Sequence, residues 1–243
     1  MKYFELHRDD WDGIYHAPAG SVRARFNRRF RRAVWARMAI ALWEYPSQSG
    51  GSVLDVGCGT GELGIRLAQR GAARVLGIDL ANNMVETARV RAAKAGVEQR
   101  CEFVQGDFLE SDLGNESFDL VVALGVLDYV SDATRLLERM WRACRGTLVV
   151  SLPHSRPPRS WLRRLWHGLH GSRLHYYGAT DISDAIARLS PLSARVHSIH
   201  GSDRTDVLVC ERRPGNQEST PAAAQLRRWR GAELEALLAQ VRA

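Results

Sequence analysis

Short apolar runs alternate with helical patterns through the middle of the chain. The runs read as strands, and five of them follow one another: 53–56, 74–78, 102–105, 118–124 and 147–151. The stretches between them have helical periodicity, at 62–70, at 82–95 and from a possible N-cap at Ser131 to about Cys144. The run at 118–124 is apolar almost throughout, as in a strand covered on both faces. This alternation predicts an α/β fold with a doubly wound, mostly parallel sheet and helices on both faces.

The two ends of the chain differ from this middle part. A short helix at 181–189 and two strands at 194–200 and 206–212 complete a predicted sheet of seven strands. Before the core, apolar residues recur at helical spacing from about Ser21 to Trp43, with arginines between them. After it, a polar stretch leads to a predicted helix at 222–243. We therefore divide the chain into an N-terminal helical lid (1–48), a Rossmann-like core (49–213), and a flexible linker with a C-terminal helical extension (214–243).

Glycines cluster directly after the first predicted strand. The segment reads Asp55-Val56-Gly57-Cys58-Gly59-Thr60-Gly61 and stands between a strand and a helix, where open α/β sheets bind nucleotides. Glycine lets the backbone approach a ligand closely and leaves the helix N-terminal amides free to donate. A dinucleotide fingerprint requires G-x-G-x-x-G, whereas here the third glycine comes one position early and Glu62 fills the expected place. The spacing therefore argues against a dehydrogenase.

This loop resembles the D/E-x-G-x-G-x-G loop of class I S-adenosylmethionine-dependent methyltransferases. Three later segments are similar to the same family and occur in its order: Gly77-Ile78-Asp79-Leu80, Gln105-Gly106-Asp107-Phe108 and the fourth predicted strand, 118–124. The resemblance is close over roughly 52–151 and loose elsewhere. The segments 123–130, 151–154 and 175–177 resemble its small-molecule branch, with a distant likeness to magnesium-protoporphyrin O-methyltransferases that does not assign their substrate.

The resemblance implies S-adenosyl-L-methionine as the cofactor and a set of residues that bind it. Asp79, at a strand end, has a carboxylate that can accept hydrogen bonds from both ribose hydroxyls. By resemblance, Asp107 accepts from the adenine amino group, Phe108 lies beside the ring, and Met84 packs on its face. The implied cofactor-binding residues are Asp55, Gly57, Cys58, Gly59, Gly61, Asp79, Leu80, Met84, Gly106, Asp107, Phe108 and Leu124.

Methyl transfer from a sulfonium is an in-line displacement, so the protein mainly supplies binding, orientation and electrostatics. A general base helps when the acceptor is an alcohol or an ammonium group. The candidates at the carboxyl ends of the fourth and fifth strands are Asp128, Tyr129 and His154. Other side chains that could fold over the mouth of the site are Tyr15, His16, His175, Tyr176 and Tyr177. Each of these residues also has a purely structural interpretation.

The chain has a formal net charge of +7, and arginine carries nearly all of the positive charge because Lys2 and Lys94 are the only lysines. Arginine suits bidentate contact with phosphate or carboxylate, which favours an anionic acceptor such as a phosphorylated, carboxylated or lipid-linked molecule. A solvated basic surface is the alternative interpretation. An RNA methyltransferase remains a second hypothesis, although no N-P-P-Y or D-P-P-Y motif is present. A non-catalytic cofactor-binding protein is the third.

The four cysteines show no metal-binding or disulfide spacing. No stretch approaches the roughly 20 apolar residues that span a bilayer, and the N-terminus does not resemble a signal peptide. Buried, reduced thiols and the absence of these segments predict a cytoplasmic protein without a metal site. The proposed methyl acceptor is an oxygen or nitrogen of a small metabolite, a sugar or a lipid-linked molecule.

Overall fold

The structure, a computed structural model, describes residues 32–45, 50–154, 174–199, 205–212, 225–229 and 231–242. Its strands are β1 (Ser52–Val56), β2 (Arg74–Asp79), β3 (Cys101–Gln105), β4 (Phe118–Ala123), β5 (Cys144–Pro153), β6 (Ser193–Ile199), β7 (Thr205–Glu211) and β8 (Gln225–Trp229). Its helices are α4 (Arg32–Glu44), α5 (Glu62–Gln69), α6 (Asn82–Lys94), the 3-10 turn η1 (Leu127–Tyr129), α7 (Ala133–Ala143), α9 (Ala179–Leu189) and α10 (Gly231–Arg242).

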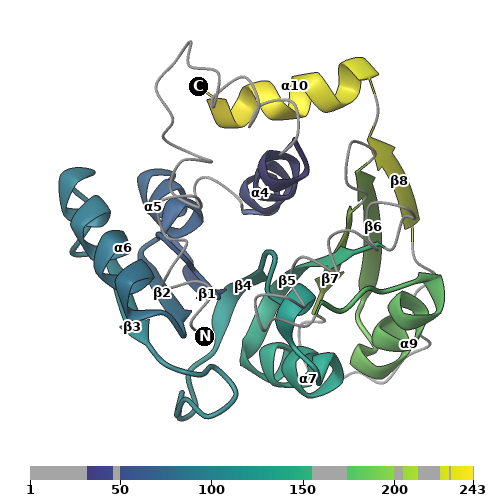
Figure 1. The fold of residues 1–243 in the computed structure, drawn as a ribbon, viewed down its shortest axis with the longest axis horizontal. Helices are drawn as coiled ribbons and strands as arrows, with labels where there is room; N and C mark the ends of the chain where they lie inside the picture. The colour runs from purple at the N-terminus through teal and green to yellow at the C-terminus, as the bar shows by residue number, and fades with distance from the viewer. Residues whose placement is uncertain are drawn as a thin grey trace.

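All described strands belong to one sheet with the order β3-β2-β1-β4-β5-β7-β6-β8 (Figure 1). Strands β1 to β5 run parallel, and β7 pairs antiparallel with both β5 and β6. The strand order reverses between β1 and β4, so the connections leave these two strands in opposite directions. Ligands of open α/β sheets bind in the crevice at the carboxyl ends of such a pair.

Two apolar layers cover the two faces of the sheet. Helices α4, α5 and α6 bury one cluster, which includes Ile40, Leu67 and Ala88. Helices α7 and α9 bury the other, which includes Met140 and Ile186. Figure 1 shows α10 lying on the outer side of α4, so that α4 is placed between α10 and the sheet. The predicted doubly wound α/β architecture is confirmed.

The predicted number of seven strands is wrong, because the described residues alone form a sheet of eight strands. The segment 225–229, expected to lie in a C-terminal helix, is strand β8 and pairs parallel with β6. Its residue pattern explains the error: Leu226 is 57% exposed, whereas Trp229 is buried. The apolar residue that appeared to continue a helical stripe therefore faces solvent, and the helix begins later, at Gly231.

Other boundaries shift by smaller amounts. Asp132, not Ser131, is the N-cap of α7, and its side chain accepts a hydrogen bond from the amide of Arg135 at 2.9 Å. Strand β5 begins at Cys144, directly after α7, instead of at residue 147. The first part of the predicted N-terminal helix, together with Tyr15 and His16, lies outside the described residues, as does the segment 155–173.

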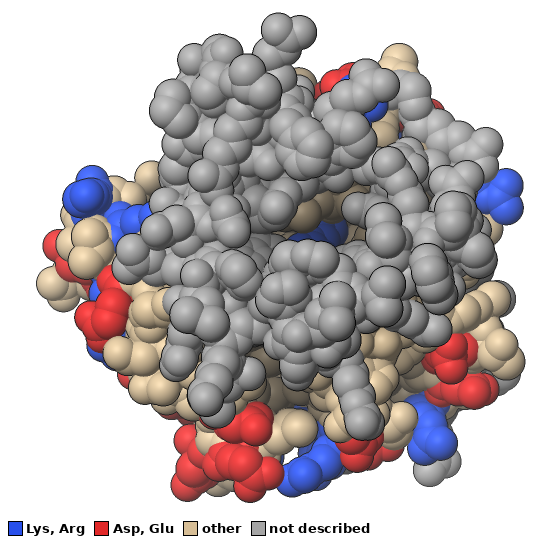
Figure 2. All heavy atoms as spheres, viewed as in Figure 1, with Lys and Arg blue, Asp and Glu red and all other residues tan. Residues whose placement is uncertain are grey.

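In the described part of the chain, no helix is long and apolar enough to cross a membrane, and no group of three or more His, Cys, Asp or Glu side chains could hold a metal ion. All four cysteines are free thiols; Cys58, Cys144 and Cys210 are buried. Around the outline of the face shown in Figure 2, basic and acidic side chains of the described residues alternate.

Candidate active site

The glycine-rich loop leaves β1 and turns back beneath the end of β2. The amides of Gly57 and Cys58 both donate to the carbonyl oxygen of Ile78, at 2.7 and 3.2 Å. Gly57, Gly59 and Gly61 all have positive φ, at 70°, 53° and 77°. A side chain would strain the backbone at each of these positions, which is why the loop requires glycine there.

The three glycines have different surroundings. A Cβ atom on Gly57 would lie 2.3 Å from Val126 Cγ2, and one on Gly61 would lie 2.8 Å from Ala88 Cβ and 2.9 Å from Phe103 Cζ. A Cβ atom on Gly59 would meet nothing within 4 Å. Gly61 therefore permits close packing of helices and sheet, whereas the backbone of Gly59 borders open space that a ligand can enter.

Asp79, at the end of β2, ties the loop to the next turn. Its Oδ2 accepts from the amide of Gly59 at 2.8 Å, and its Oδ1 accepts from the amide of Ala81 at 2.9 Å. Burial raises the pKa of this carboxyl, although both amide hydrogen bonds act to lower it. Each carboxylate oxygen retains a second lone pair, so Asp79 can still accept from a ligand's hydroxyl groups.

Asp55, at the end of β1, is the most strongly perturbed acid of the site. Its side chain is 3% exposed, and within the described residues its Oδ2 has no hydrogen-bond partner. Burial, followed by the nearby carboxylate of Asp79, raises the pKa of Asp55 from 3.8 to about 7. An acid in these surroundings is stabilised in its charged form by a cation placed beside it.

Arg37 contributes positive charge to the same cavity from α4. The helix turns its residues Val34, Arg37 and Met38 toward the loop. A Cβ atom built on Gly125, just beyond β4, would lie 2.7 Å from Arg37 Nη2. The guanidinium therefore lies directly over the Gly125 backbone, and no acceptor within the described residues forms a hydrogen bond or an ion pair with it.

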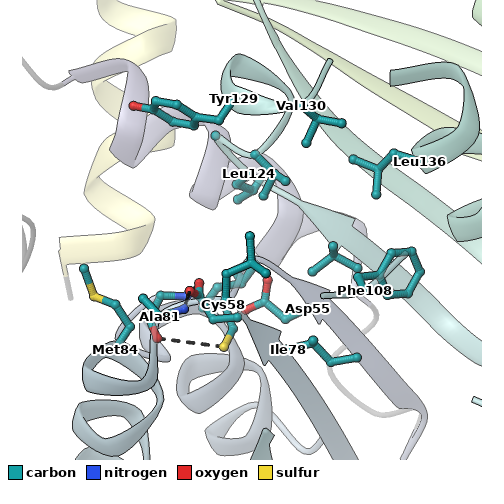
Figure 3. A pocket seen from close by; sticks show the side chains of 18 of the residues that line it. Asp55, Cys58, Ile78, Ala81, Met84, Phe108, Leu124, Tyr129, Val130 and Leu136 are labelled. Atoms are coloured by element: carbon teal, nitrogen blue, oxygen red, sulfur yellow. Dashed lines mark hydrogen bonds between the residues drawn. The ribbon is translucent and has the colours of Figure 1, made fainter. Parts of the chain in front are cut away.

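These groups surround a cavity of about 450 Å³, a size typical of small-molecule sites. Figure 3 shows Asp55 and Cys58 at its base, Met84 on one side, and Leu124 and Tyr129 above them. Phe108, Val130 and Leu136 form an apolar wall on the opposite side from Met84. The cavity thus combines a polar glycine loop with an apolar wall.

The side of the cavity near β3 is lined by the predicted pair of an acid and an aromatic residue, Asp107 and Phe108. Asp107 lines the cavity and is exposed, and its Oδ1 accepts from the amide of Leu109 at 2.9 Å. Phe108 is 4% exposed, and the guanidinium carbon of Arg139 lies 5.4 Å from its ring centroid. Met84 is 3% exposed and also lines the cavity, on α6.

The three catalytic candidates differ in position. Tyr129 lines the cavity, whereas Asp128 and His154 do not. Asp128 is 5% exposed, and its carbonyl oxygen accepts from the amide of His175 at 2.8 Å. His154 Nδ1 lies 3.4 Å from Oδ2 of the buried Asp206, on β7. The structure therefore brings only one of these three predicted residues to the cavity described here.

Of the predicted cofactor-binding residues, all but Gly61 line the cavity. The sequence interpretation missed the residues that α4 contributes, above all Arg37. A signal was present: Arg37 stands three residues after Val34 and four before Ala41, on the apolar stripe of the predicted helix. A charged residue on such a stripe is unusual in a buried helix face, and here the side chain lines the cavity.

Comparison with known proteins finds similarity to methyltransferases. A family model described as a methyltransferase domain matches residues 53–146. The 27-O-demethylrifamycin SV methyltransferase of Amycolatopsis mediterranei is 37% identical over 100 residues, which are 41% of this chain and 37% of the relative. The 2-phytyl-1,4-naphtoquinone methyltransferase of Nostoc punctiforme is 32% identical over 133 residues, or 54% of this chain and 57% of the relative.

Among solved structures, the magnesium protoporphyrin IX methyltransferase of Synechocystis PCC 6803 with bound S-adenosylhomocysteine superposes with a TM-score of 0.70. It is 21% identical, and the match covers 87% of this chain and 97% of that one. The chain spans roughly two fifths to three fifths of the length of the two curated relatives.

The sheet order, the reversal between β1 and β4 and the glycine loop define a Rossmann-like methyltransferase fold. Residues 53–146 match the methyltransferase-domain family model, and the fold is similar to that of class I S-adenosylmethionine-dependent methyltransferases.

Proposed function

We propose that this protein transfers a methyl group from S-adenosylmethionine to an oxygen or nitrogen of a small molecule. The observation that supports this proposal most strongly is the distribution of charged side chains around the glycine loop. The buried Asp55 and the partly buried Asp79 line the cavity, and the guanidinium of Arg37 lies over Gly125. The amino-acid part of this cofactor carries an ammonium, a sulfonium and a carboxylate. Both signs of charge in the cavity therefore have a counterpart in the ligand.

The same cavity also fits the nucleoside part. Asp79 accepts from the ribose hydroxyls with the lone pairs that its two amide contacts leave available. Met84 and Phe108 offer apolar surface for the adenine ring, and Asp107 offers an acceptor for its amino group. Gly59 leaves room for the backbone of the loop to contact the ligand. The set is compatible with S-adenosylmethionine and does not favour a dinucleotide.

The chemistry supplied by the bound cofactor is an activated methyl group on a sulfonium. The protein's own residues have three tasks. Asp55 and Arg37 would hold the amino-acid part, the glycine loop would present its backbone to the cofactor, and the apolar side chains of Val130 and Leu136 would limit the access of water to the cavity. Transfer between correctly oriented reactants requires no metal ligand from these residues.

Tyr129 is the proposed residue for contact with the acceptor, because it is the catalytic candidate that lines the cavity. Its phenol can orient an acceptor hydroxyl or amine, or take its proton through water. Asp128 and His154 do not line this cavity. In Tyr129→Phe we expect acceptor turnover to fall by about ten- to a hundred-fold, while affinity for S-adenosylhomocysteine stays within about two-fold.

The apolar wall of the cavity and the names of the relatives support a proposed acceptor class. The curated relatives are named for methylation of a rifamycin and a phytyl-naphthoquinone, and the solved structure for a magnesium porphyrin. All three are molecules with a large apolar framework. The wall of this cavity is apolar as well, and Arg37 is the only lysine or arginine among the described residues that line it. An apolar metabolite or lipid-linked acceptor is therefore favoured over a polyanion such as RNA.

Calorimetric titration with S-adenosylmethionine and S-adenosylhomocysteine tests the proposal. We expect micromolar binding of both ligands. We expect Asp79→Ala to weaken it by about 10- to 100-fold, because a charged acceptor contributes about 1.5–3 kcal/mol. Glu98→Ala, at an exposed acid of a surface turn, is the matched control and should bind as the unchanged protein does.

Binding of both ligands, lost in the Asp79 variant, justifies a screen of quinone, porphyrin, polyketide and lipid-linked acceptors with a radiolabelled methyl group. A folded protein that binds neither ligand would refute the proposed function.

A further inference from the structure

The C-terminal strand and helix form a unit that packs on α4. Strand β8 extends the sheet beyond β6, and α10 crosses the outer side of α4 (Figure 1). Three leucines of α10, Leu234, Leu237 and Leu238, are at most 3% exposed and share a core with Ile40 and Leu42 of α4. We call β8 and α10 together the clasp.

Polar and aromatic contacts connect the clasp to the end of α4, and we call this set of contacts the joint. The indole Nε1 of Trp229, on β8, donates to Nδ1 of His197 at 3.0 Å. The ring centroid of Trp229 lies 5.9 Å from that of Trp43, at an angle of 76°. The guanidinium carbon of Arg227 lies 4.0 Å from the Trp229 ring centroid and 5.1 Å from that of Trp43.

The joint continues through Glu44, the last residue of α4. Its Oε2 accepts from Arg195 Nη2 at 2.6 Å, and its Oε1 lies 3.8 Å from His197 Nε2. Arg195 also donates to Glu211 at 2.9 Å. The carboxyl end of α4 is therefore held by β6, β7 and β8 at once.

The same helix carries Arg37 to the cavity. Val34, Arg37 and Met38 face the glycine loop, two turns before the joint at Trp43 and Glu44. A helix is nearly rigid over this distance, so a shift at one end moves the other. The position of the Arg37 guanidinium over Gly125 thus depends on how the contacts with α10 and β8 position α4.

We propose that the clasp is a positioning device for the cofactor site: it holds α4 so that Arg37 meets the carboxylate of the amino-acid part. Residues of the clasp act through Arg37 and do not touch the ligand. The inference rests on the proposed function and deepens it, since it specifies which half of the cofactor depends on the C-terminal unit.

Two ligands distinguish this effect from a general loss of stability. S-adenosylhomocysteine has the amino-acid part, whereas 5′-methylthioadenosine keeps the nucleoside and lacks the carboxylate. The ratio of the two affinities therefore reports on Arg37. We expect Arg37→Gln to weaken S-adenosylhomocysteine by about ten-fold or more and to leave 5′-methylthioadenosine nearly unchanged.

The clasp variants are Leu237→Ala, which loosens α10 from α4, and Trp229→Phe, which removes the donor to His197. We expect both to lower the affinity ratio in the same direction as Arg37→Gln, by about three- to ten-fold, at a temperature where circular dichroism shows them folded. Leu226→Ala, at the exposed position of the same strand, is the matched control and should keep the ratio.

Each outcome decides a different point. Suppose that Arg37→Gln lowers the affinity ratio. If the two clasp variants then weaken both ligands equally, or leave both affinities unchanged, the positioning role is overturned. If Arg37→Gln itself leaves the ratio unchanged, the assignment of Arg37 fails and the clasp inference fails with it. If neither ligand binds the unchanged protein, the proposed function is at fault.

Discussion

At Asp55, the stability of the ligand-free protein and the proposed cofactor binding should have opposite pH dependences. Its carboxyl is buried with one oxygen lacking a partner among the described residues, and its pKa is raised to about 7. A ligand cation placed beside it stabilises the charged form and lowers this pKa. Binding of S-adenosylhomocysteine should therefore release a proton near neutral pH, and affinity should rise with pH up to about 7.

Calorimetry in two buffers of different ionisation enthalpy measures that proton. We expect affinity to increase several-fold between about pH 6 and about pH 7.5 and the dependence to be much weaker in Asp55→Asn, which cannot ionise. The same slope in both proteins would show that another group titrates.

The stability of the ligand-free protein should change in the opposite direction. The folded pKa of Asp55 lies above its ordinary value of 3.8, so the stabilising contribution of this group is present below about pH 4 and is lost as pH rises through about 7. Asp55→Asn should therefore melt at a higher temperature than the unchanged protein at about pH 8, and the difference should shrink toward about pH 4. Differential scanning calorimetry without ligand checks this expectation.

Alanine substitutions at two glycines of the loop should have different effects, one mainly on stability and the other mainly on cofactor affinity. Both have positive φ, so a methyl group costs about 1–2 kcal/mol at either position. At Gly61 the added carbon also meets Ala88 and Phe103, whereas at Gly59 it enters open space. Gly61→Ala should reduce the free energy of unfolding more, by about 2–4 kcal/mol in total, and Gly59→Ala should reduce cofactor affinity more. Urea unfolding and ligand titration of both variants separate the two effects, and a reversed order would contradict the geometry.

At the scale of single residues, a cavity residue could be predicted from the sequence when it lies close along the chain to the end of a core strand. The loop, Asp79 and Asp107 follow strand ends in a fixed order, so local spacing was sufficient to place them beside the cavity. Arg37 reaches the same cavity from a helix that precedes the first strand, and no local spacing links it to Gly125. Asp128 and His154 follow strand ends too, but they do not line this cavity, so position after a strand end was not sufficient.

At the scale of elements, β8 is the one that the sequence pattern concealed. Its exposed Leu226 resembled part of a helical stripe, and its pairing partner β6 lies about 30 residues earlier. A short edge strand is defined by its partner more than by its own pattern. The parallel core strands, in contrast, are apolar enough to be recognised without their neighbours.

The contact between β8 and β6 should weaken in acid. Burial, followed by the charges of Arg195 and Arg227, lowers the pKa of His197 from 6.5 to about 4. The neutral form is favoured in the folded protein, so its contribution is present above about pH 6.5 and is lost as pH falls through about 4. Glu44, at 3.8 Å, is the acid that faces this ring.

Amide hydrogen exchange of β8 measures this loosening. Exchange corrected for the intrinsic rate should accelerate between about pH 6.5 and about pH 4.5, and His197→Gln should show a smaller change over that interval. An equal acceleration in both proteins would show that His197 does not control the joint.

For the whole molecule, the fold directs unlike parts of the chain to one cavity. Strands β1, β2 and β4 bring the glycine loop and the acids to one edge, while α4, held from outside by the clasp, brings the arginine. Residues far apart in the sequence thus line one cavity. The resemblance could identify the first set, which is local to the core, and not the second.

The N-terminal segment before α4 provides the final prediction. Residues 1–31 lie outside the described part, but they join the chain at Arg32, on the same helix as the cavity-lining residues Val34 and Arg37. If this segment is a lid over the acceptor, deleting residues 1–30 should reduce methyl transfer by about a hundred-fold and leave S-adenosylhomocysteine affinity within about three-fold. Single-turnover assays and calorimetry on the same preparation measure both quantities. Equal loss of both would assign the segment to the support of α4, because Arg37 would then be displaced together with the rest of the helix.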